Sequence, residues 1–392
     1  MTGRITVGMP LFNGQDFVAE ALRALQAQTF SDFEVIISVD GNDQVSAEAC
    51  RPFLADRRFR MVVQTERLDW VGNFNWLLEQ SAGAFFCYRQ HDDTTAPDFF
   101  EKLLAVADRR PDAAIVYADC QFVGEQSHIE ATPSIEGETH QRLRQFIERI
   151  TPTACRGIIR KEAIAQAGAV RVDEFRSNQQ IFVWLAKVLR WGSFLRLPEP
   201  IYYRRIHGDN YHKQNRRWSD EKKVGDWTTV FTGLLEAVLP TCTSVEERLF
   251  FQTFILDRVC VARSGQSYWI RPDTIEKSGL FILRCFERLA AEGNMDRWIA
   301  LDPLVAPDTP PTTLADVIAS EARRHRLAME QAELERDRLL QENARLKARN
   351  KAKTEKNKAL ATENKALAAE NRTLRDAKAV RFERAVRRLF GR

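Results

Sequence analysis

The chain has 392 residues, of which 44% are hydrophobic and 29% charged, and its formal net charge is +4. This composition is ordinary for a soluble protein that buries a core, and the length allows two or more domains. A net charge this small gives no sign of nucleic-acid binding, so no nucleic-acid partner is expected. No run of eighteen apolar residues occurs, which excludes a membrane-spanning helix.

Cysteine usage favours a reducing compartment. The seven cysteines are scattered and form no C-x-x-C pair, which is typical of buried thiols rather than of a disulfide framework or a zinc site. The first residues run directly into a strand-like segment, without the basic and apolar regions of a signal peptide. We therefore expect a cytoplasmic protein.

Strand-like and helix-like segments alternate through the first 120 residues. Apolar, β-rich runs predict strands at residues 5–9, 33–39, 60–64, 84–88 and 113–117. Apolar residues at helical spacing predict helices between them, at residues 17–28, 46–54, 70–81 and 99–107. The alternation predicts a Rossmann-like α/β domain, whose mostly parallel central sheet has helices on both faces. In such sheets, ligands bind beyond the carboxyl ends of the strands.

The pattern changes beyond residue 120. Mixed sequence with helices near residues 142–150 and 180–189 precedes a mostly helical region, four prolines between residues 303 and 311, and a long alanine-, glutamate- and lysine-rich run. The predicted division is an α/β domain at 1–222, a helical domain at 223–305, a proline-rich linker at 306–317, a coiled coil at 318–376 and a basic amphipathic tail at 377–392.

Two adjacent carboxylates, Asp92 and Asp93, follow the fourth predicted strand directly after His91. Adjacent carboxylates repel each other unless a cation or hydrogen-bond donors compensate. Mg²⁺ or Mn²⁺ would do so, because such ions take oxygen ligands and leave room for phosphates and water. A solvated turn with a helix N-cap is the alternative, and it is the commoner case for an isolated Asp-Asp pair.

Other polar residues lie at comparable positions. Asp40 ends the second strand, where it would either accept hydrogen bonds from a nucleobase or ribose or form a turn. Asn73 and Asn75 lie near a predicted helix start, where they would either cap the helix or shape a nucleotide pocket. Asn13, Asp40 and His91 all follow strand ends, and this coincidence is the first indication of a site.

The order of these segments resembles the family 2 glycosyltransferases, which have the GT-A fold. The resemblance covers about residues 4–212, and its strength lies in the ordered set of motifs and not in any one of them. The matching segments are V-G-M-P-L-F-N-G from Val7, I-S-V-D-G from Ile37, the helix with Asn75 leading to S-A-G at Ser81, H-D-D at His91 followed by Pro97, and P-E-P-I-Y-Y-R-R-I-H from Pro198.

The resemblance implies a metal-dependent, hexosyltransferase-like enzyme that moves a sugar, with inversion, from a nucleoside diphosphate donor to an acceptor hydroxyl. A glycan or lipid-linked acceptor in bacterial-type cell-surface glycan synthesis is expected. The residues implied for nucleotide-sugar binding are Pro10, Phe12, Asn13, Asp40, Asn73, Asn75 and Asp92. Those implied for Mg²⁺ or Mn²⁺, which would act as a Lewis acid on the leaving group, are Asp93 foremost, His91 and His207. A loop histidine bonded to backbone is the alternative for His207.

Two positions depart from the family's pattern. His91 stands where many members have the first aspartate of Asp-x-Asp, which leaves the metal dependent on Asp93 and water, since magnesium prefers oxygen ligands. The family's acidic catalytic base precedes the helix at 181–189, whereas residues 177–180 here carry no carboxylate. Asp173 and Glu174 are the nearest replacements, and a base must come within hydrogen-bond reach of the attacking hydroxyl.

A heptad pattern begins at Glu342. Asparagine recurs every seven residues from Asn343 to Asn371, and leucine precedes it by four residues in most repeats. Leucine at d with asparagine at a is typical of a coiled-coil seam and favours self-association as a parallel dimer. A solvated single helix with many charge pairs is the alternative.

The last residues predict a basic helix with one apolar face, formed by Phe382, Val386, Leu389 and Phe390. Such a helix can lie on anionic lipid, which would place the protein peripherally at the inner face of the membrane. A solvated helix end and a dock for a partner protein are the other interpretations.

Two further functions compete with the transferase. A nucleotide-binding or scaffold protein of the same fold with weakened catalysis would explain His91 and the missing base. A nucleotidyltransferase on a similar sheet is less favoured, because no glycine-rich phosphate loop follows the first strand. Donor hydrolysis that is abolished by Asp93→Ala would favour the transferase.

Overall fold

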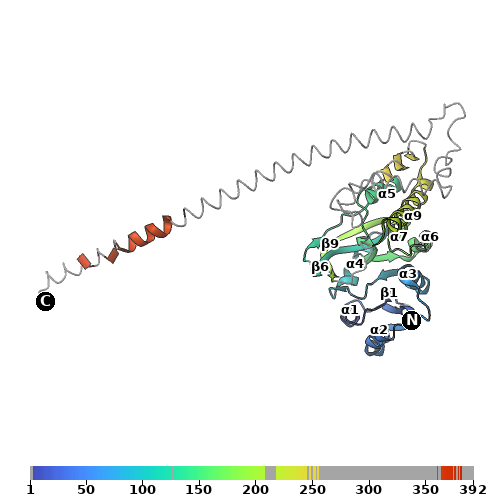
Figure 1. Ribbon diagram of the computed structural model, residues 1–392, viewed down its shortest axis with the longest axis horizontal. Helices are drawn as coiled ribbons and strands as arrows, with labels where there is room; N and C mark the ends of the chain where they lie inside the picture. Colours follow the sequence, from blue (N-terminus) through green and yellow to red (C-terminus); the bar gives the residue numbers. More distant parts are fainter. Residues whose placement is uncertain are drawn as a thin grey trace, which may run out of the picture. The chain divides into compact units, whose positions relative to one another are not determined.

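The computed structural model describes residues 3–125, 127–207 and 218–244 and, with gaps, 247–255 and 360–381. The chain divides into two units, Met1–Val305 and Ala306–Arg392 (Figure 1). The predicted linker, the first part of the predicted coiled coil and the tail beyond residue 381 lie outside the described residues. In the second unit, the described residues are helical and exposed.

The N-terminal half of the sheet is parallel. Its central strand β1 (Ile5–Leu11) pairs with β2 (Phe33–Val39) on one side and with β4 (Phe85–Tyr88) on the other, and β2 pairs with β3 (Phe59–Val63). Apolar runs form these strands because both faces of a parallel sheet are covered. Every residue of β1 is buried.

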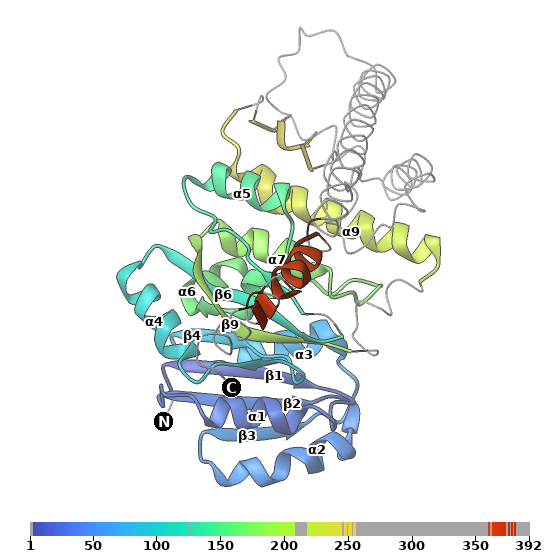
Figure 2. The ribbon, with the colours of Figure 1, turned by 90° about the vertical axis from the view of Figure 1, so that its left-hand side faces the viewer.

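The second half of the sheet is mixed. The strand order is β3-β2-β1-β4-β8-β6-β9-β5, with β7 beside β6 (Figure 2). The short β8 is antiparallel to both β4 and β6, while β6 and β9 are parallel to each other. The bounds are β5 Thr94–Thr95, β6 Ala113–Gly124, β7 Ile129–Glu130, β8 Ile158–Arg160 and β9 Ser193–Ile206. The predicted α/β fold with a mostly parallel sheet is confirmed.

Helices cover both faces of this sheet. Residues of α1 (Val18–Gln26), α2 (Gln44–Cys50) and α4 (Phe99–Arg109) belong to the hydrophobic core on one face. The core on the other face contains residues of α3 (Asp69–Gln80), α5 (Thr139–Glu148), α6 (Lys161–Ala167), α7 (Gln180–Leu189) and α9 (Asp220–Val238). Single turns of 3₁₀ helix are η1 Asp40–Asn42, η2 Arg51–Ala55, η3 Thr153–Arg156 and η4 Leu239–Thr241.

Helix α9 packs closely on α7. The predicted domain boundary at residue 222 falls inside α9, whose apolar residues join the same core as α7. A Cβ atom on Gly233 would lie 2.8 Å from Val183 Cγ2, so the absence of a side chain lets the two helices approach. Residues 223–238 therefore share the core of the α/β unit.

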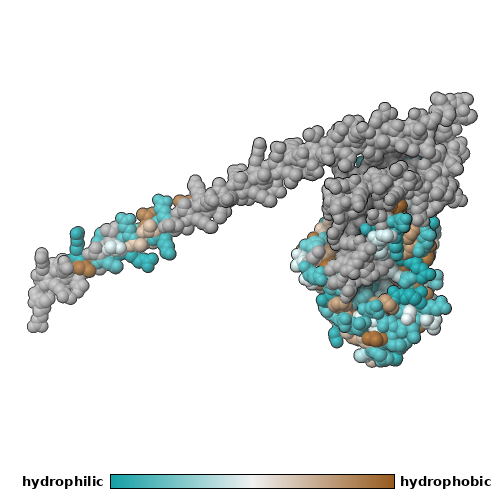
Figure 3. All heavy atoms as spheres, viewed as in Figure 1, coloured by the Kyte–Doolittle hydropathy of each residue, from teal (hydrophilic) through white to brown (hydrophobic). Residues whose placement is uncertain are grey.

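The described surface offers few apolar features. On the face in Figure 3, hydrophobic residues are scattered among hydrophilic ones. No helix in the described part of the chain is long and apolar enough to cross a membrane. The five cysteines within it, from Cys50 to Cys242, are free thiols, of which four are buried.

Candidate active site

Two loops meet beyond the carboxyl ends of β1 and β2. The backbone N–H of Asn13 donates to Asp43 Oδ2 at 2.7 Å, and that of Gly14 donates to Ser46 Oγ at 3.0 Å. Asn13 holds a φ of 51°, a left-handed conformation that asparagine tolerates better than most residues. A Cβ atom on Gly14 would lie 2.5 Å from the His91 ring, so only glycine lets this ring lie against the loop.

Asp40 is buried where β2 ends and organises the turn that begins α3. Its carboxylate accepts hydrogen bonds from the N–H groups of Leu68 at 2.7 Å and Asp69 at 3.0 Å, and pairs with Arg67 Nε at 3.0 Å. Burial raises the pKa of Asp40, and these donors offset the effect only in part. Asp40 thus fixes Arg67 and Asp69 at the rim of the sheet.

Phe12 and Arg67 form a stacked pair beside Asp40. The Arg67 guanidinium carbon lies 3.1 Å from the centre of the Phe12 ring. The Phe12 side chain is 38% exposed, so part of its ring faces solvent beside the guanidinium group. Pro10, in contrast, is buried within β1 opposite Ser38.

Asp92 and His207 meet at the end of β9. Their Oδ2 and Nε2 atoms lie 3.1 Å apart, and the side chains are 12% and 20% exposed. Burial opposes ionisation of Asp92, but the His207 hydrogen bond and the nearby imidazoles outweigh it and lower the pKa of this carboxyl. Phe17 packs on the His207 ring, with the ring centres 4.6 Å apart.

Asp93 differs from its neighbour, because both of its oxygens are engaged by β9. Its carboxylate accepts hydrogen bonds from the Tyr202 hydroxyl at 2.7 Å and from the Arg205 N–H at 3.0 Å, and it is almost fully buried. Burial and the adjacent Asp92 raise the pKa of Asp93 to about 6. Burial likewise lowers the pKa of the His91 ring, which favours neutral imidazole.

Asn73 and Asn75 lie inside α3, so neither caps the helix. The Asn73 amide nitrogen donates to the Ser38 carbonyl at 3.1 Å and ties α3 to β2. Asn75 exchanges two hydrogen bonds with the backbone of Val170, at 2.7 and 2.8 Å. Asn75 therefore joins two segments through both of its polar atoms, whereas the buried Asn73 Oδ1 has no hydrogen-bond partner within the described residues.

The segment before α7 approaches the Asp40 turn. Arg176, with a φ of 49°, reaches Asp69 Oδ2 at 2.6 Å. Asp173 accepts hydrogen bonds from the Phe175 N–H, from Gln180 Nε2 at 2.6 Å and from Thr229 Oγ1 at 2.9 Å. Glu174 is exposed.

A carboxylate that the sequence prediction missed lies behind this segment, on α9. Asp226 is fully buried, and its Oδ2 accepts a hydrogen bond from Ser177 Oγ at 3.2 Å. The sequence does hold a signal for it. Asp226 continues the i+4 series of Val230, Leu234 and Val238, all of them buried, and an aspartate on such a face is unusual.

The β1–α1 loop contacts residues from both groups of predicted side chains. Phe12 contacts Arg67, Gly14 lies against His91, and Phe17 packs on His207. The Asp40 turn and the Asp92–His207 pair therefore flank a single loop at one edge of the sheet. Within the described ranges, no group of three or more histidine, cysteine, aspartate or glutamate side chains could hold a metal ion by itself.

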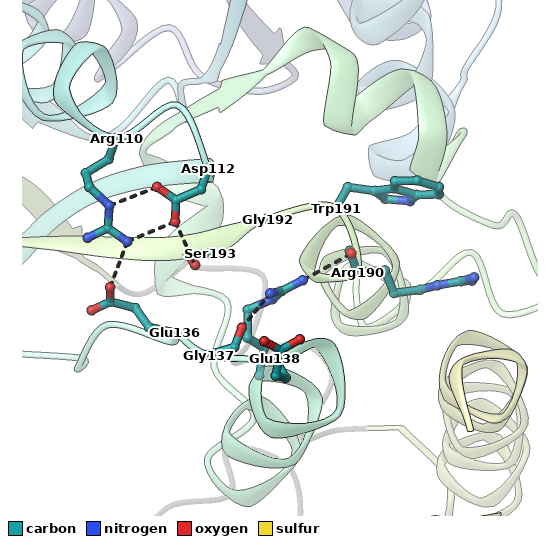
Figure 4. Close-up of a pocket in the computed structure, with 10 residues that line it drawn as sticks. Arg110, Asp112, Glu136, Gly137, Glu138, Arg190, Trp191, Gly192 and Ser193 are labelled. Carbon is teal, nitrogen blue, oxygen red and sulfur yellow. Dashed lines mark hydrogen bonds and ion pairs between the residues drawn. The ribbon is translucent and has the colours of Figure 1, made fainter. Parts of the chain in front are cut away.

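A separate hollow of about 530 Å³ lies at the opposite edge, where β6 and β9 begin. Figure 4 shows Arg110 bonded to both Asp112, at 2.8 Å, and Glu136, at 2.9 Å. Because these charged groups satisfy one another, the hollow offers them to no ligand. It holds none of the predicted site residues.

Residues 6–166 match the family model described as Glycosyl transferase family 2. The chain carries a family 2 glycosyltransferase domain. Its similar proteins include the amylovoran biosynthesis glycosyltransferase AmsB of Erwinia amylovora, 20% identical over 55% of this chain and 72% of that protein. The putative glycosyltransferase EpsH of Bacillus subtilis is 26% identical over 53% of this chain and 62% of its own length.

A solved structure shares the fold of this glycosyltransferase domain. The crystal structure of residues 1–349 of S. aureus TarS in complex with UDP-GlcNAc matches with a TM-score of 0.56 and 17% identity. The match covers 74% of this chain and 83% of that one. The similarity establishes the GT-A fold.

Proposed function

We propose that this protein transfers a sugar, with inversion, from a nucleoside diphosphate sugar to an acceptor hydroxyl. The nucleoside end of the donor would bind over Phe12 and Arg67 beside Asp40, and the diphosphate would bind at Asp92 and His207. The observation that carries the proposal is the β1–α1 loop, which contacts both places and sets them side by side along one sheet edge.

The side chains of Asp92 and His207 fit a divalent cation. Mg²⁺ sites commonly use one or two carboxylates and fill the remaining positions with water and substrate phosphates, so the Asp92 carboxylate would be the main ligand, with the His207 imidazole beside it. Asp93 was the foremost candidate from sequence, but it is 1% exposed and each of its oxygens accepts a hydrogen bond from β9, whereas Asp92 is 12% exposed. We therefore assign the metal to Asp92 and His207, where it would neutralise charge on the diphosphate leaving group.

Bacterial cell-surface glycan synthesis is the proposed setting. It is supported by the similarity to AmsB, whose name assigns it to amylovoran biosynthesis. A glycan or lipid-linked acceptor would suit this setting. Dimerisation through residues 318–376 and attachment of the basic tail to anionic lipid are retained as proposals, because most of these residues lie outside the described part of the chain.

The test measures release of the nucleoside diphosphate, which is UDP from UDP-GlcNAc (the donor present in the TarS complex) and UDP-glucose, and GDP from GDP-mannose, with Mn²⁺ added or chelated. We expect turnover with one of these donors, lost on chelation and reduced about 100-fold or more by Asp92→Asn. Asp108→Asn is the matched control, because Asp108 is an exposed carboxylate on α4 that pairs with Arg4.

The alternative is a nucleotide-binding scaffold of the same fold, which the carboxylate-free segment 177–180 favours. Tight UDP binding without turnover of any donor would establish the scaffold and reject the transferase.

A further inference from the structure

Asp226 is a buried carboxylate on α9 that lacks full hydrogen bonding. Its side chain is fully buried, and its Oδ1 has no hydrogen-bond partner within the described residues. An unsatisfied buried carboxylate oxygen is costly and rare in folded proteins. Such a group therefore calls for a functional explanation.

The surroundings of Asp226 place it behind the segment that leads into α7. Ser177 Oγ donates to Asp226 Oδ2 at 3.2 Å and accepts from the Gln179 N–H at 3.1 Å. A serine hydroxyl has one proton and two lone pairs, so one lone pair of Ser177 stays available for another donor. An acceptor hydroxyl that donates to this lone pair would be connected to Asp226 through the Ser177 hydroxyl alone.

This segment also contacts the turn at Asp40, where the nucleoside of the donor is proposed to bind. Arg176 immediately precedes Ser177 and pairs with Asp69, whose backbone N–H is bonded to Asp40. Ser177 is thus connected to the turn proposed to bind the nucleotide through its neighbour Arg176 and the Arg176–Asp69 ion pair.

The two carboxylates suggested by the sequence are less suited to accept a proton here. Asp173 already receives three hydrogen bonds, from Phe175, Gln180 and Thr229, and the last of these links the segment to α9. Glu174 is exposed to solvent, whereas the proposed path of the proton leads into the buried core.

We propose that Asp226, acting through the Ser177 hydroxyl, accepts the proton of the acceptor during sugar transfer; the inference rests on the proposed function. The acceptor oxygen forms a bond to the anomeric carbon as the bond from that carbon to the phosphate oxygen breaks. The nucleoside diphosphate leaves with the electron pair. The acceptor proton passes to Ser177 Oγ, and the serine proton passes to Asp226.

Ser177 and Asp226 are both enclosed, so the acceptor reaches them only when the segment 171–176 shifts. Four of its six residues, Arg171, Val172, Glu174 and Arg176, are exposed. Arg176 adds a left-handed backbone conformation, which is strained for a long side chain. The shift would have to separate the ion pairs of Arg176 with Asp69 and of Arg171 with Glu236.

The acid–base properties of Asp226 suit this role. Burial, with the Asp173 charge adding to it, raises the pKa of Asp226 to about 7, although the Ser177 hydrogen bond and the Lys222 charge oppose the shift. A proton acceptor works best when its pKa lies near the working pH. Transfer should therefore increase with pH through about 7, as Asp226 ionises.

Asp226→Asn tests the inference in the full-length protein, with UDP-GlcNAc, UDP-glucose and GDP-mannose as probes. We expect kcat to fall about 100-fold or more, with KM for the donor and UDP affinity unchanged, because an amide cannot take the proton. The rise of activity near pH 7 should disappear, and Asp226→Glu should recover part of it. Ser177→Ala should share the loss of kcat, while Ser177→Thr keeps a hydroxyl and most of the rate.

Thermal unfolding and UDP binding show whether each variant is folded. A folded Asp226→Asn protein that keeps wild-type kcat and pH profile would overturn the inference and leave the transferase intact, and so would loss of activity in Glu174→Gln alone. Wild-type protein that turns over none of the three donors would overturn the proposed function, and the role of Asp226 with it.

Discussion

Residues with strained, positive φ angles lie close to the proposed donor site. In the described chain, the non-glycine residues with positive φ are Asn13, Asn42, Asp69 and Arg176. Asn13 and Asn42 follow β1 and β2, Asp69 is bonded to Asp40, and Arg176 is paired with Asp69. Such conformations cost about 1–3 kcal/mol each and concentrate at functional sites. Their shared location is an argument for the site that does not depend on any motif.

Phe12→Ala should weaken nucleotide binding without unfolding the protein. Stacking of a base on an aromatic ring contributes about 1–3 kcal/mol, so UDP affinity should fall roughly 5- to 150-fold. Stability should change little, because the ring is exposed. Titration calorimetry with UDP measures the effect, and Phe12→Trp should retain binding. Equal affinity of the alanine variant would place the nucleobase elsewhere.

Asp226 should make the folded protein less stable as pH rises. Its pKa is raised from 3.8 to about 7, so the folded state holds the proton more tightly than the unfolded chain does. The stabilisation is therefore complete below about pH 4 and is lost as pH rises to about 7, at roughly 1.4 kcal/mol per unit of pKa difference. Denaturant unfolding of wild type and Asp226→Asn at pH 5 and pH 8 isolates this contribution. A difference in unfolding free energy between the two proteins that does not change with pH would contradict it.

Residue types at strand ends could be predicted from sequence, but their partners could not. Asp40, Asp92 and His207 were expected at one site and lie along one edge. The distinct roles of Asp92 and Asp93 are invisible in sequence, since they depend on Tyr202, which lies 109 positions away. Asp226 was not predicted as a site residue, because its partner, Ser177, lies 49 positions away in the sequence.

Among the elements, the strands in the parallel half of the sheet could be predicted from the sequence. Predicted and observed bounds of β2 are the same, Phe33–Val39, because a strand buried on both faces is mostly apolar. Strand β9 was not predicted, since Pro198 and Pro200 interrupt it and prolines argue against an interior strand. The three-residue β8 is too short to carry any periodicity.

Gly233→Ala should destabilise the contact between α7 and α9. Alanine normally favours a helix over glycine by roughly 1 kcal/mol. Here its Cβ would lie 2.8 Å from Val183 Cγ2, and the β-branched valine cannot rotate away freely. A net loss of about 1–3 kcal/mol in unfolding free energy is expected. Adding Val183→Ala should relieve the clash, so a double-mutant cycle without coupling would refute this explanation.

On the scale of the whole molecule, the leucines of the C-terminal helix need an explanation. Leu360 and Leu367 are 46% and 49% exposed, although both occupy the d positions of the predicted heptads. Leucine at this spacing on a solvated helix is typical of a seam that a second helix covers. A second copy of this chain is the partner that we propose.

Leu360→Lys with Leu367→Lys should therefore reduce the oligomeric state. Buried lysines at two d positions cost a coiled coil far more than one asparagine does, so a dimer should dissociate to monomers at micromolar concentration. Analytical ultracentrifugation of the full-length protein measures the mass. Ala369→Lys lies off the seam and should leave the mass unchanged. A monomeric wild type would identify the single-helix alternative instead.

The engagement of Asp93 by β9 has a consequence for how proteins with the proposed site can diversify. Since Tyr202 and Arg205 of β9 hold the loop that presents Asp92, the phosphate end of the proposed donor would be anchored to that strand. The base end would rest on residues after β1 and β2, which do not contact that strand through these bonds. A lineage could therefore exchange one nucleotide for another by altering Phe12 or Arg67 while its phosphate chemistry stayed the same.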